Sequence, residues 1–139
     1  MIKNKQLVCD KEKGDCFRAC LTSILELPND SKLPNCDQTD WLSRWHTFLY
    51  DFGLTLNYEQ KSCWRLGYWI ANVKSKNFAD TTHAIVMNGT DVAHDPSTKE
   101  CYLEAESLLG QDVVLGGWSL EAIDPSKLYQ LEEYKRSIN

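Results

Sequence analysis

The order of the predicted secondary structure constrains the fold of this chain more than any other feature. Two amphipathic helical patterns come first, over residues 17–27 and from about residue 39 to residue 52. Strand-like segments follow the helices, at residues 54–58, 67–73, 83–87 and 91–94. Because helices and strands are grouped along the chain and do not alternate, we expect an α+β fold with an antiparallel sheet.

Turn and capping residues bound these segments. Asp15 is a favourable N-cap for the first helix, and Pro28 ends that helix. Gly53 is a suitable C-cap for the second helix. The rest of the pattern is weaker. It predicts a short helix over residues 101–110, a strand over 112–118 and a frayed tail over 131–139.

Composition indicates one globular domain spanning residues 1–139. A hydrophobic content of 42% is enough for a packed core, and a net charge of −5 argues against nucleic acid, which needs a concentrated basic face. No secretion signal precedes Cys16, and no apolar run reaches the roughly 18 residues of a membrane span. We therefore expect a cytoplasmic protein with no membrane partner and with reduced cysteines. The oligomeric state stays open.

Cys16 is the strongest candidate for a nucleophile. It would lie in the first turn of the first helix, where free backbone N–H groups and the helix dipole favour a thiolate. Its own N–H could donate a hydrogen bond to an oxyanion. A lone cysteine is more often a buried structural residue, and Cys20, one turn later on the apolar face, fits that description.

A predicted β-hairpin brings a histidine and an aspartate together. With a turn at residues 88–90, Met87 faces Asp91, and counting outward sets His83 opposite Asp95. A carboxylate there can orient one imidazole nitrogen and leave the other for the thiol. That is the arrangement of a nucleophile, a base and an orienting acid.

Two other interpretations of these residue types are weaker. His94 would lie on the opposite face of its strand from Asp95, and we expect it to be structural. Zinc is the main chemical alternative, but the four cysteines before residue 40 contain no CxxC pair and lack the usual ligand spacings. We therefore expect no metal and no cofactor.

The same residues lie in motifs that resemble a known family. The run GDCFRAC at residues 14–20, with Leu-Pro-Asn at 33–35, resembles the opening of small papain-like cysteine peptidase domains. The runs HAIVMNG at 83–89 and VAHDPS at 92–97 resemble their later hallmark. The spacing of tryptophans and glycine over 41–53 resembles the family's middle helix. The relatives that these motifs suggest are bacterial and phage proteins related to the C39 (double-glycine) peptidases.

The resemblance covers about residues 6–96 and implies a papain-like fold, with the nucleophile on a helix packed on an antiparallel sheet. It implies Cys16 as nucleophile, His83 as general base and acid, and Asp95 as orienter. It also implies a glutamine before the cysteine as oxyanion donor. Gln6 is the only glutamine there, and it lies ten residues upstream, farther than is usual in the wider superfamily.

Two functions of different classes fit these observations. The first is a cysteine peptidase-like hydrolase or acyl transferase that acts on an amide, isopeptide or thioester carbonyl of a peptide, a protein or a small amide-containing metabolite. The alternative is a non-catalytic protein on the same scaffold, such as a phage-encoded protein that sequesters a host factor in an aromatic groove. The tryptophans that could line such a groove, although most are expected in the core, are Trp41, Trp45, Trp64, Trp69 and Trp118.

Overall fold

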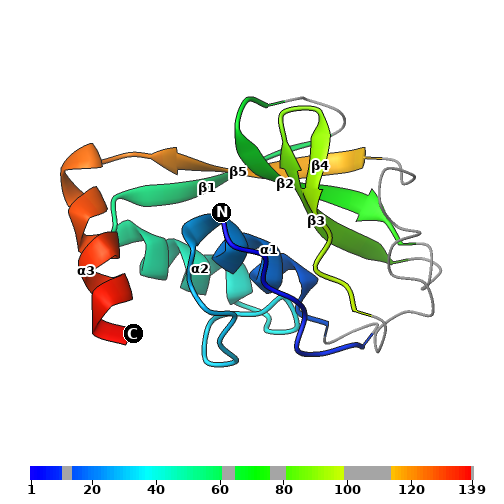
Figure 1. Ribbon diagram of the computed structural model, residues 1–139, viewed down its shortest axis with the longest axis horizontal. Helices are drawn as coiled ribbons and strands as arrows, with labels where there is room; N and C mark the ends of the chain where they lie inside the picture. The colour runs from blue at the N-terminus through cyan, green and yellow to red at the C-terminus, as the bar shows by residue number, and fades with distance from the viewer. Residues whose placement is uncertain (11–13, 61–64, 76–80, 99–113, 139) are drawn as a thin grey trace.

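The computed structural model of the chain describes residues 1–10, 14–60, 65–75, 81–98 and 114–138. Two helices cover one face of a five-stranded sheet, and a third helix lies at one end of the molecule (Figure 1). The elements, in chain order, are α1 (Cys16–Leu25), α2 (Trp41–Tyr50), β1 (Leu54–Gln60), β2 (Tyr68–Lys74), β3 (Thr82–Asn88), β4 (Asp91–His94), β5 (Val114–Ala122), the 3-10 helix η2 (Pro125–Lys127) and α3 (Leu128–Ile138).

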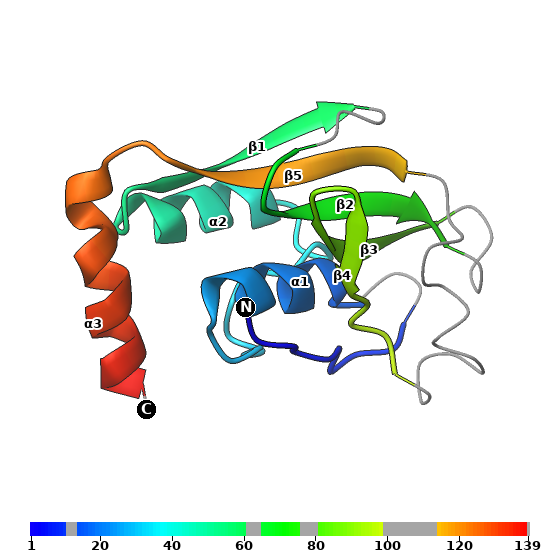
Figure 2. The same ribbon diagram turned by 45° about the horizontal axis from the view of Figure 1, so that its top comes forward.

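The sheet has the strand order β1-β5-β2-β3-β4, and each neighbouring pair is antiparallel. The last strand in the sequence, β5, therefore lies inside the sheet between β1 and β2. Helix α1 packs on β2 and β3, and α2 packs on β1 (Figure 2). The predicted α+β class with an antiparallel sheet is confirmed, and the helix that carries Cys16 lies against the strand that carries His83.

The main hydrophobic core lies between the helices and the sheet. Phe17, Leu21 and Trp45 are buried there, together with Ile70 and Val86 from the sheet. A second cluster collects the strand residues that alternate with these: Trp69, Ala71, Val73, Ile85 and Met87. Successive side chains of a strand point to opposite faces. β2 and β3 are therefore packed on both faces, which fixes the backbone of the strand that carries His83.

Helix α1 begins where the sequence predicts, but Asp15 does not cap it through its side chain. The Asp15 side chain is fully buried and accepts hydrogen bonds from the N-terminal segment instead. At the other end, Glu26 has a left-handed φ of 60°, and the N–H of Leu27 donates to the carbonyl of Thr22 over 2.9 Å. The helix thus ends shortly before Pro28, as predicted.

Gly53 follows α2 in the chain and forms hydrogen bonds with the residues that follow β5. Its φ is 71°, and its N–H donates to the carbonyl of Tyr50. Its carbonyl accepts from the N–H groups of Ile123 (2.8 Å) and Asp124 (3.1 Å). A Cβ at this position would lie 2.1 Å from the carbonyl oxygen of Asp124. The C-cap of α2 is Asp51, so the prediction that Gly53 caps this helix is wrong, but the left-handed conformation and the close approach of a second segment both require glycine at residue 53.

The C-terminal tail is helical, so the prediction that residues 131–139 fray is wrong for the residues up to Ile138. Leu131 is 9% exposed and belongs to the main core. The ring of Tyr134 contacts those of Phe48 and Phe52, with centroids 5.7 and 5.6 Å away. These apolar partners belong to α2 and to the residues just after it, which are far from α3 in the sequence. The charge pattern of residues 131–139 alone therefore could not predict that Leu131 is buried.

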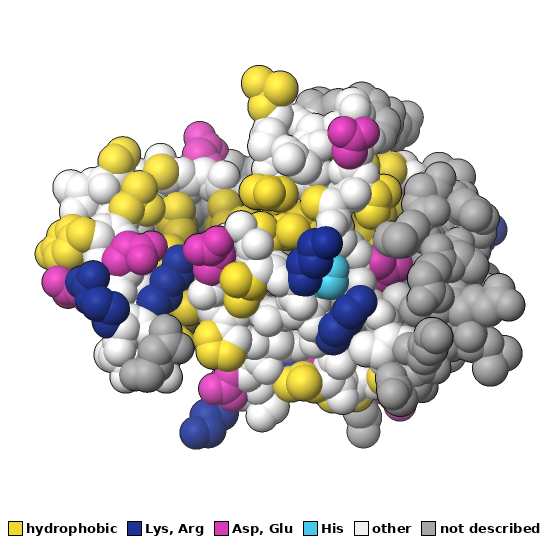
Figure 3. Space-filling model, viewed as in Figure 1, with side chains coloured by type: hydrophobic (Ala, Val, Ile, Leu, Met, Phe, Trp, Pro, Cys, Tyr) yellow, Lys and Arg dark blue, Asp and Glu magenta, His cyan; other side chains and the backbone are white. Residues whose placement is uncertain are grey.

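Two other sequence predictions concern the region before β5. The predicted strand over 112–118 overlaps the start of β5, whereas the predicted helix over 101–110 lies outside the described residues. In the described part of the chain, no helix combines the length and apolar character that crossing a bilayer requires. The face shown in Figure 3 mixes acidic, basic and apolar side chains.

Candidate active site

Cys16 is the first residue of α1, where the sequence predicted the nucleophile. It is a half-buried free thiol at the edge of the main core, unlike Cys20, which is fully buried one turn later. The first backbone N–H groups of a helix have no partner within the helix. The Cys16 sulfur therefore sits where a negative charge is favoured and where a substrate can still reach it.

The hairpin that carries His83 has a different register from the predicted one. Asn88, and not Met87, faces Asp91, and the turn consists of Gly89 and Thr90. Gly89 has a φ of 59°, which supports a tight turn of this kind. The error of one residue arises because the sequence Asn-Gly-Thr is compatible with a two-residue or a three-residue loop.

A β-bulge in β4 follows this turn. Met87 pairs with Val92, but the next residue of β3, Val86, pairs with His94, so Ala93 is an extra residue in β4. A shift of one residue turns every later side chain to the other face of a strand. The bulge therefore determines on which face of the sheet the side chain of Asp95 lies.

The bulge directs Asp95 towards His83. Counting on from the pair of Val86 and His94 sets Asp95 opposite Ile85, on the same face as His83 and diagonal to it. Diagonal neighbours lie within reach of long side chains. Nε2 of His83 is in fact 2.7 Å from Oδ1 of Asp95, so the predicted hydrogen bond is present.

The second contact of His83 is with the candidate nucleophile. The Cys16 side chain also interacts with this ring, through a hydrogen bond and a charge that both raise the pKa of His83. His83 is only 2% exposed, and its burial opposes a charge on the ring. The hydrogen bonds and charges of Asp95 and Cys16 outweigh burial and raise the pKa of His83 to about 10. The contacts thus favour the imidazolium form of His83.

Asp95 is held in its ionised form. Burial tends to raise its pKa, but the hydrogen bond and charge of His83, with further hydrogen bonds from Ser97, lower the pKa overall. The backbone N–H of Ser97 donates to Oδ1 over 2.9 Å, on the same oxygen that faces His83. A carboxylate with these partners can fix the orientation of the ring and stabilise its positive charge.

Gln6 lies next to the start of α1 despite its distance in the sequence. The Gly14 N–H donates to the Asp10 carbonyl over 3.0 Å, so Asp10 lies close to the start of α1. Nε2 of Gln6 lies 3.6 Å from the place that a Cβ of Gly14 would occupy, and it donates to the carbonyl of Val8 over 3.3 Å. Gln6 is 8% exposed, and its Oε1 accepts no hydrogen bond from the described part of the chain. Despite the long spacing, this amide therefore lies beside Gly14, two residues before Cys16.

Asp15 contacts the segment that carries Gln6, although its sequence position suggests only a helix cap. Its carboxylate bonds the backbone N–H groups of Leu7 and Val8, on the C-terminal side of Gln6. The available signal was an acidic residue directly before the candidate nucleophile, with Arg18 three positions later, where it can form an ion pair on a helix.

The other described cysteines differ from Cys16. Burial, with the charges of Cys16, Asp95 and Asp15, raises the pKa of Cys20 well above its ordinary value. Cys36 is an exposed residue, yet desolvation of its sulfur, with the nearby charges of Cys16 and Asp37, raises its pKa to about 12. Burial therefore excludes Cys20 as a nucleophile, and the exposed Cys36 is the thiol with which the reactivity of Cys16 is to be compared.

Cys9 corrects the expectation that all cysteines are reduced, because it is disulfide-bonded. The N-terminal segment runs beside the residues that follow β4: the N–H of Gln6 donates to the carbonyl of Pro96 over 2.9 Å, and the Cys9 sulfur is 3.9 Å from the Thr98 hydroxyl. The spacing of the cysteines along the sequence could not predict that Cys9 is disulfide-bonded. Disulfides are rare in the cytosol, so the bond gives no support to a cytoplasmic location.

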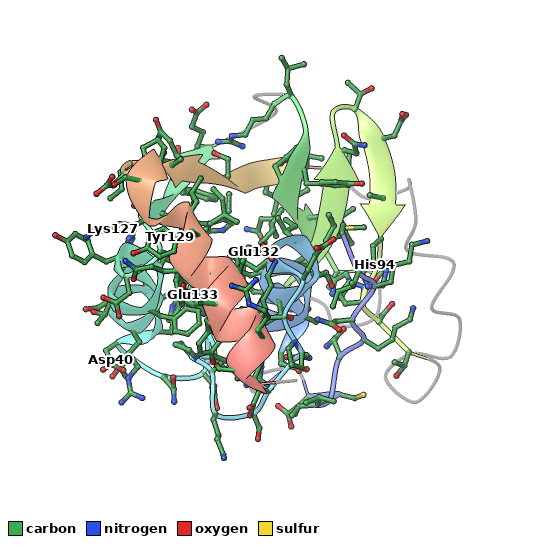
Figure 4. The ribbon with its side chains drawn as sticks, turned by 60° about the vertical axis from the view of Figure 1, so that its left-hand side comes forward. Asp40, His94, Lys127, Tyr129, Glu132 and Glu133 are labelled. Carbon is green, nitrogen blue, oxygen red and sulfur yellow. The ribbon has the colours of Figure 1, made fainter. Side chains whose placement is uncertain are left out.

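The remaining histidine of the hairpin has a structural contact, as predicted. Nε2 of His94 is hydrogen-bonded to the backbone carbonyl of Asn4, and His94 lies beside the N-terminal segment (Figure 4). Burial lowers its pKa, with a further contribution from the charges of Lys5 and Lys3. No group of three or more potential metal-ligating side chains occurs within the described ranges.

The tryptophans divide between the core and the surface. Trp45 and Trp69 are at most 1% exposed, whereas Trp41 and Trp118 are half-buried. The rings of Trp41 and Trp118 meet each other edge-on, and both contact Phe17, the residue after Cys16. Two of the five candidate groove residues therefore remain available at the surface, and Trp64 lies outside the described residues.

Comparison with known proteins found no family model, no curated protein and no solved structure that matches this chain.

Proposed function

We propose that this protein is a cysteine peptidase-like hydrolase or acyl transferase that acts on an amide, isopeptide or thioester carbonyl. The observation that carries the proposal is the His83 ring, which is hydrogen-bonded to Asp95 through Nε2 and also interacts with the Cys16 side chain. A buried histidine with a purely structural role needs neither a half-exposed thiol nor a second charged partner. The arrangement supports a papain-like architecture, with the nucleophile on a helix that packs on an antiparallel sheet.

The first half-reaction forms a thioester. The Cys16 thiolate attacks the substrate carbonyl carbon, and the carbonyl oxygen becomes an oxyanion. The N–H of Cys16 and Nε2 of Gln6 are the donors that stabilise it. When the bond from the carbonyl carbon to the leaving group breaks, His83 donates its proton to that group, and an acyl-enzyme with a neutral imidazole remains.

The second half-reaction releases the acyl group. Neutral His83 accepts a proton from water, or from another nucleophile, as it attacks the thioester carbonyl. The carbon–sulfur bond breaks, Cys16 leaves as a thiolate, and the proton on His83 restores the starting ion pair. Asp95 keeps the ring oriented and stabilises its charged form throughout. The choice between water and a second substrate decides between hydrolase and transferase.

Acetylation by p-nitrophenyl acetate tests the proposal without knowledge of the natural substrate. Each acetylation releases p-nitrophenolate and leaves one acetyl group, which peptide mapping should find on Cys16. Cys16→Ala should lose this adduct, and His83→Ala should slow its formation strongly. The wild-type protein must acetylate at Cys16 faster than at Cys36; equal or slower acetylation would overturn the proposal.

Cys16→Ala should leave the fold intact. The side chain is half-buried and the substitution removes one sulfur atom, so we expect a loss of about 1 kcal/mol in the free energy of unfolding. Denaturant unfolding of the variant checks this value. A much larger loss would mean that the lost acetylation reflects unfolding, and the comparison would then be repeated with Cys16→Ser.

Binding without turnover is the second candidate, and the half-buried pair Trp41 and Trp118 favours it. In that case a biological effect in the native host should survive Cys16→Ala and should be lost on Trp118→Ala. The enzyme predicts the opposite for Cys16→Ala, so this one variant separates the two functions.

A further inference from the structure

The carboxylate of Asp15 links the start of α1 to the N-terminal segment. Its side chain is fully buried. Oδ1 accepts from the backbone N–H groups of Leu7 and Val8, each over 3.0 Å, and Oδ2 also lies 3.0 Å from the Leu7 nitrogen. Only a carboxylate can accept this many hydrogen bonds at one place. Asp15 thus holds two consecutive backbone groups of a segment that forms no regular secondary structure.

Two side chains complete the surroundings of this carboxylate. Arg18 donates from Nη2 to Oδ2 over 3.1 Å and is almost fully buried. Asn29 donates from Nδ2 to the same oxygen over 2.8 Å, and its Oδ1 accepts from Nε of Arg18 over 2.8 Å. The three side chains form a closed network in which the buried charge of Asp15 is balanced by Arg18.

This network fixes Gln6 from both sides. Asn29 donates to the carbonyl of Lys5, the residue before Gln6, over 3.0 Å. Asp15 bonds the two residues after Gln6, and the N–H of Gln6 itself donates to the carbonyl of Pro96, next to Asp95. A mobile glutamine could not serve as a preorganised donor, because its amide would have to be ordered in the transition state.

We infer that Asp15 is a positioning residue, which holds the Gln6 amide at the place where an oxyanion forms on attack by Cys16. This inference rests on the proposed function. Asp15 acts through Gln6: it sets the backbone of residues 5–8, and the Gln6 side chain then lies beside Gly14, two residues before Cys16. Asn29 supports the same geometry from its contacts with Asp15 and Lys5.

Two reagents separate an effect on the oxyanion from an effect on the thiolate. Iodoacetamide forms a carbon–sulfur bond at a saturated carbon and releases iodide, so no oxyanion develops at that carbon. p-Nitrophenyl acetate passes through a tetrahedral oxyanion before p-nitrophenolate leaves. The ratio of the acetylation rate to the alkylation rate of Cys16 therefore reports the oxyanion donors and cancels changes in thiolate population.

The variants are Gln6→Ala, Asp15→Asn, Asn29→Ala and the double variant Gln6→Ala/Asp15→Asn. Loss of one oxyanion donor typically lowers a rate about 10²-fold, so Gln6→Ala should lower the ratio by about that factor. Asp15→Asn should lower it in the same direction, and Asn29→Ala less, because Asn29→Ala leaves the carboxylate in place. The double variant should be no worse than Gln6→Ala alone, since Asp15 acts only through Gln6.

Leu131→Ala in α3 is the matched control for lost stability, because it removes core packing without touching the N-terminal segment, and it should leave the ratio unchanged. Amide hydrogen exchange of Leu7 and Val8 gives a second readout that needs no chemistry: both should be protected in the wild type and exposed in Asp15→Asn. If Asp15→Asn does not fold, the same measurements on Asn29→Ala decide.

Each outcome has a separate meaning. If Cys16 is alkylated but not acetylated in the wild type, the proposed function fails, and this inference fails with it. If Gln6→Ala lowers the ratio but Asp15→Asn and Asn29→Ala do not, only the role of Asp15 is overturned. Additive effects in the double variant, or rapid exchange of Leu7 and Val8 in the wild type, would also overturn it.

Discussion

The ring of His83 is joined to Asp95 by a hydrogen bond of 2.7 Å between Nε2 and Oδ1, although the two residues are not opposite each other in the hairpin. The bond depends on the extra residue in β4, which turns the side chain of residue 95 to the same face as residue 83. A hairpin with the same turn and no bulge would point the carboxylate to the other face.

Cys16 should be the first described thiol to react with iodoacetamide at neutral pH. Cys16 lies at the start of α1 beside the positively charged ring of His83, whereas burial raises the pKa of Cys20 and desolvation raises that of Cys36. Peptide mapping after limited alkylation measures the order of labelling. Cys16→Ala serves as the control for background reaction. Labelling of Cys36 before Cys16 would contradict the assignment of the nucleophile.

His83 should remain protonated well above neutral pH. Its pKa is raised from 6.5 to about 10, so its charged form stabilises the folded protein fully below about pH 6.5. This contribution is lost as the pH rises through about 10. NMR titration of the histidine ring signals, assigned with His83→Ala, measures the pKa directly. His94, whose pKa is lowered, is the internal control, and a titration of His83 near 6.5 would refute the ion pair.

Asp95→Asn should lower the pKa of His83 and slow acetylation less than Cys16→Ala or His83→Ala. The amide oxygen can still accept from Nε2 of His83 and from the Ser97 N–H, but it carries no charge to stabilise the imidazolium. The same NMR titration and the acetylation assay measure both effects. Ser97→Ala, which keeps the backbone N–H, is the control. An unchanged His83 pKa in Asp95→Asn would show that the carboxylate has no part in the ion pair.

The thermal stability should respond to a reductant and not to a chelator. Reduction frees Cys9 from its disulfide, and a native disulfide commonly contributes about 2–4 kcal/mol. No potential metal cluster occurs in the described part of the chain, so EDTA should leave Tm unchanged. Thermal melts with each reagent make the comparison. A Tm that falls when EDTA is added would show that the fold needs a metal ion. A Tm that does not change when the reductant is added would show that the Cys9 disulfide does not stabilise the fold.

Local sequence was sufficient to locate most elements and to predict that Cys16, His83 and Asp95 come together. The apolar periods of residues 17–27 and the alternation after residue 54 predict α1 and β1, because helix and strand burial follow the periods 3.6 and 2. Asp-Cys before an amphipathic helix, and His and Asp at the two ends of a hairpin, are features of short segments, so the sequence could predict that His83 and Asp95 lie close together, although not their register.

Only the tertiary structure decided how the distant segments meet. The bulge at Ala93, the burial of Leu131 in a tail that looked polar, the disulfide of Cys9 and the approach of Gln6 to Gly14 all depend on contacts between parts of the chain that are far apart in sequence. Asp15 shows the reason most clearly. By local propensity it is a helix cap, but in the fold its carboxylate is surrounded by backbone and side-chain donors from residues 7, 8, 18 and 29, and those bonds outweigh the local preference.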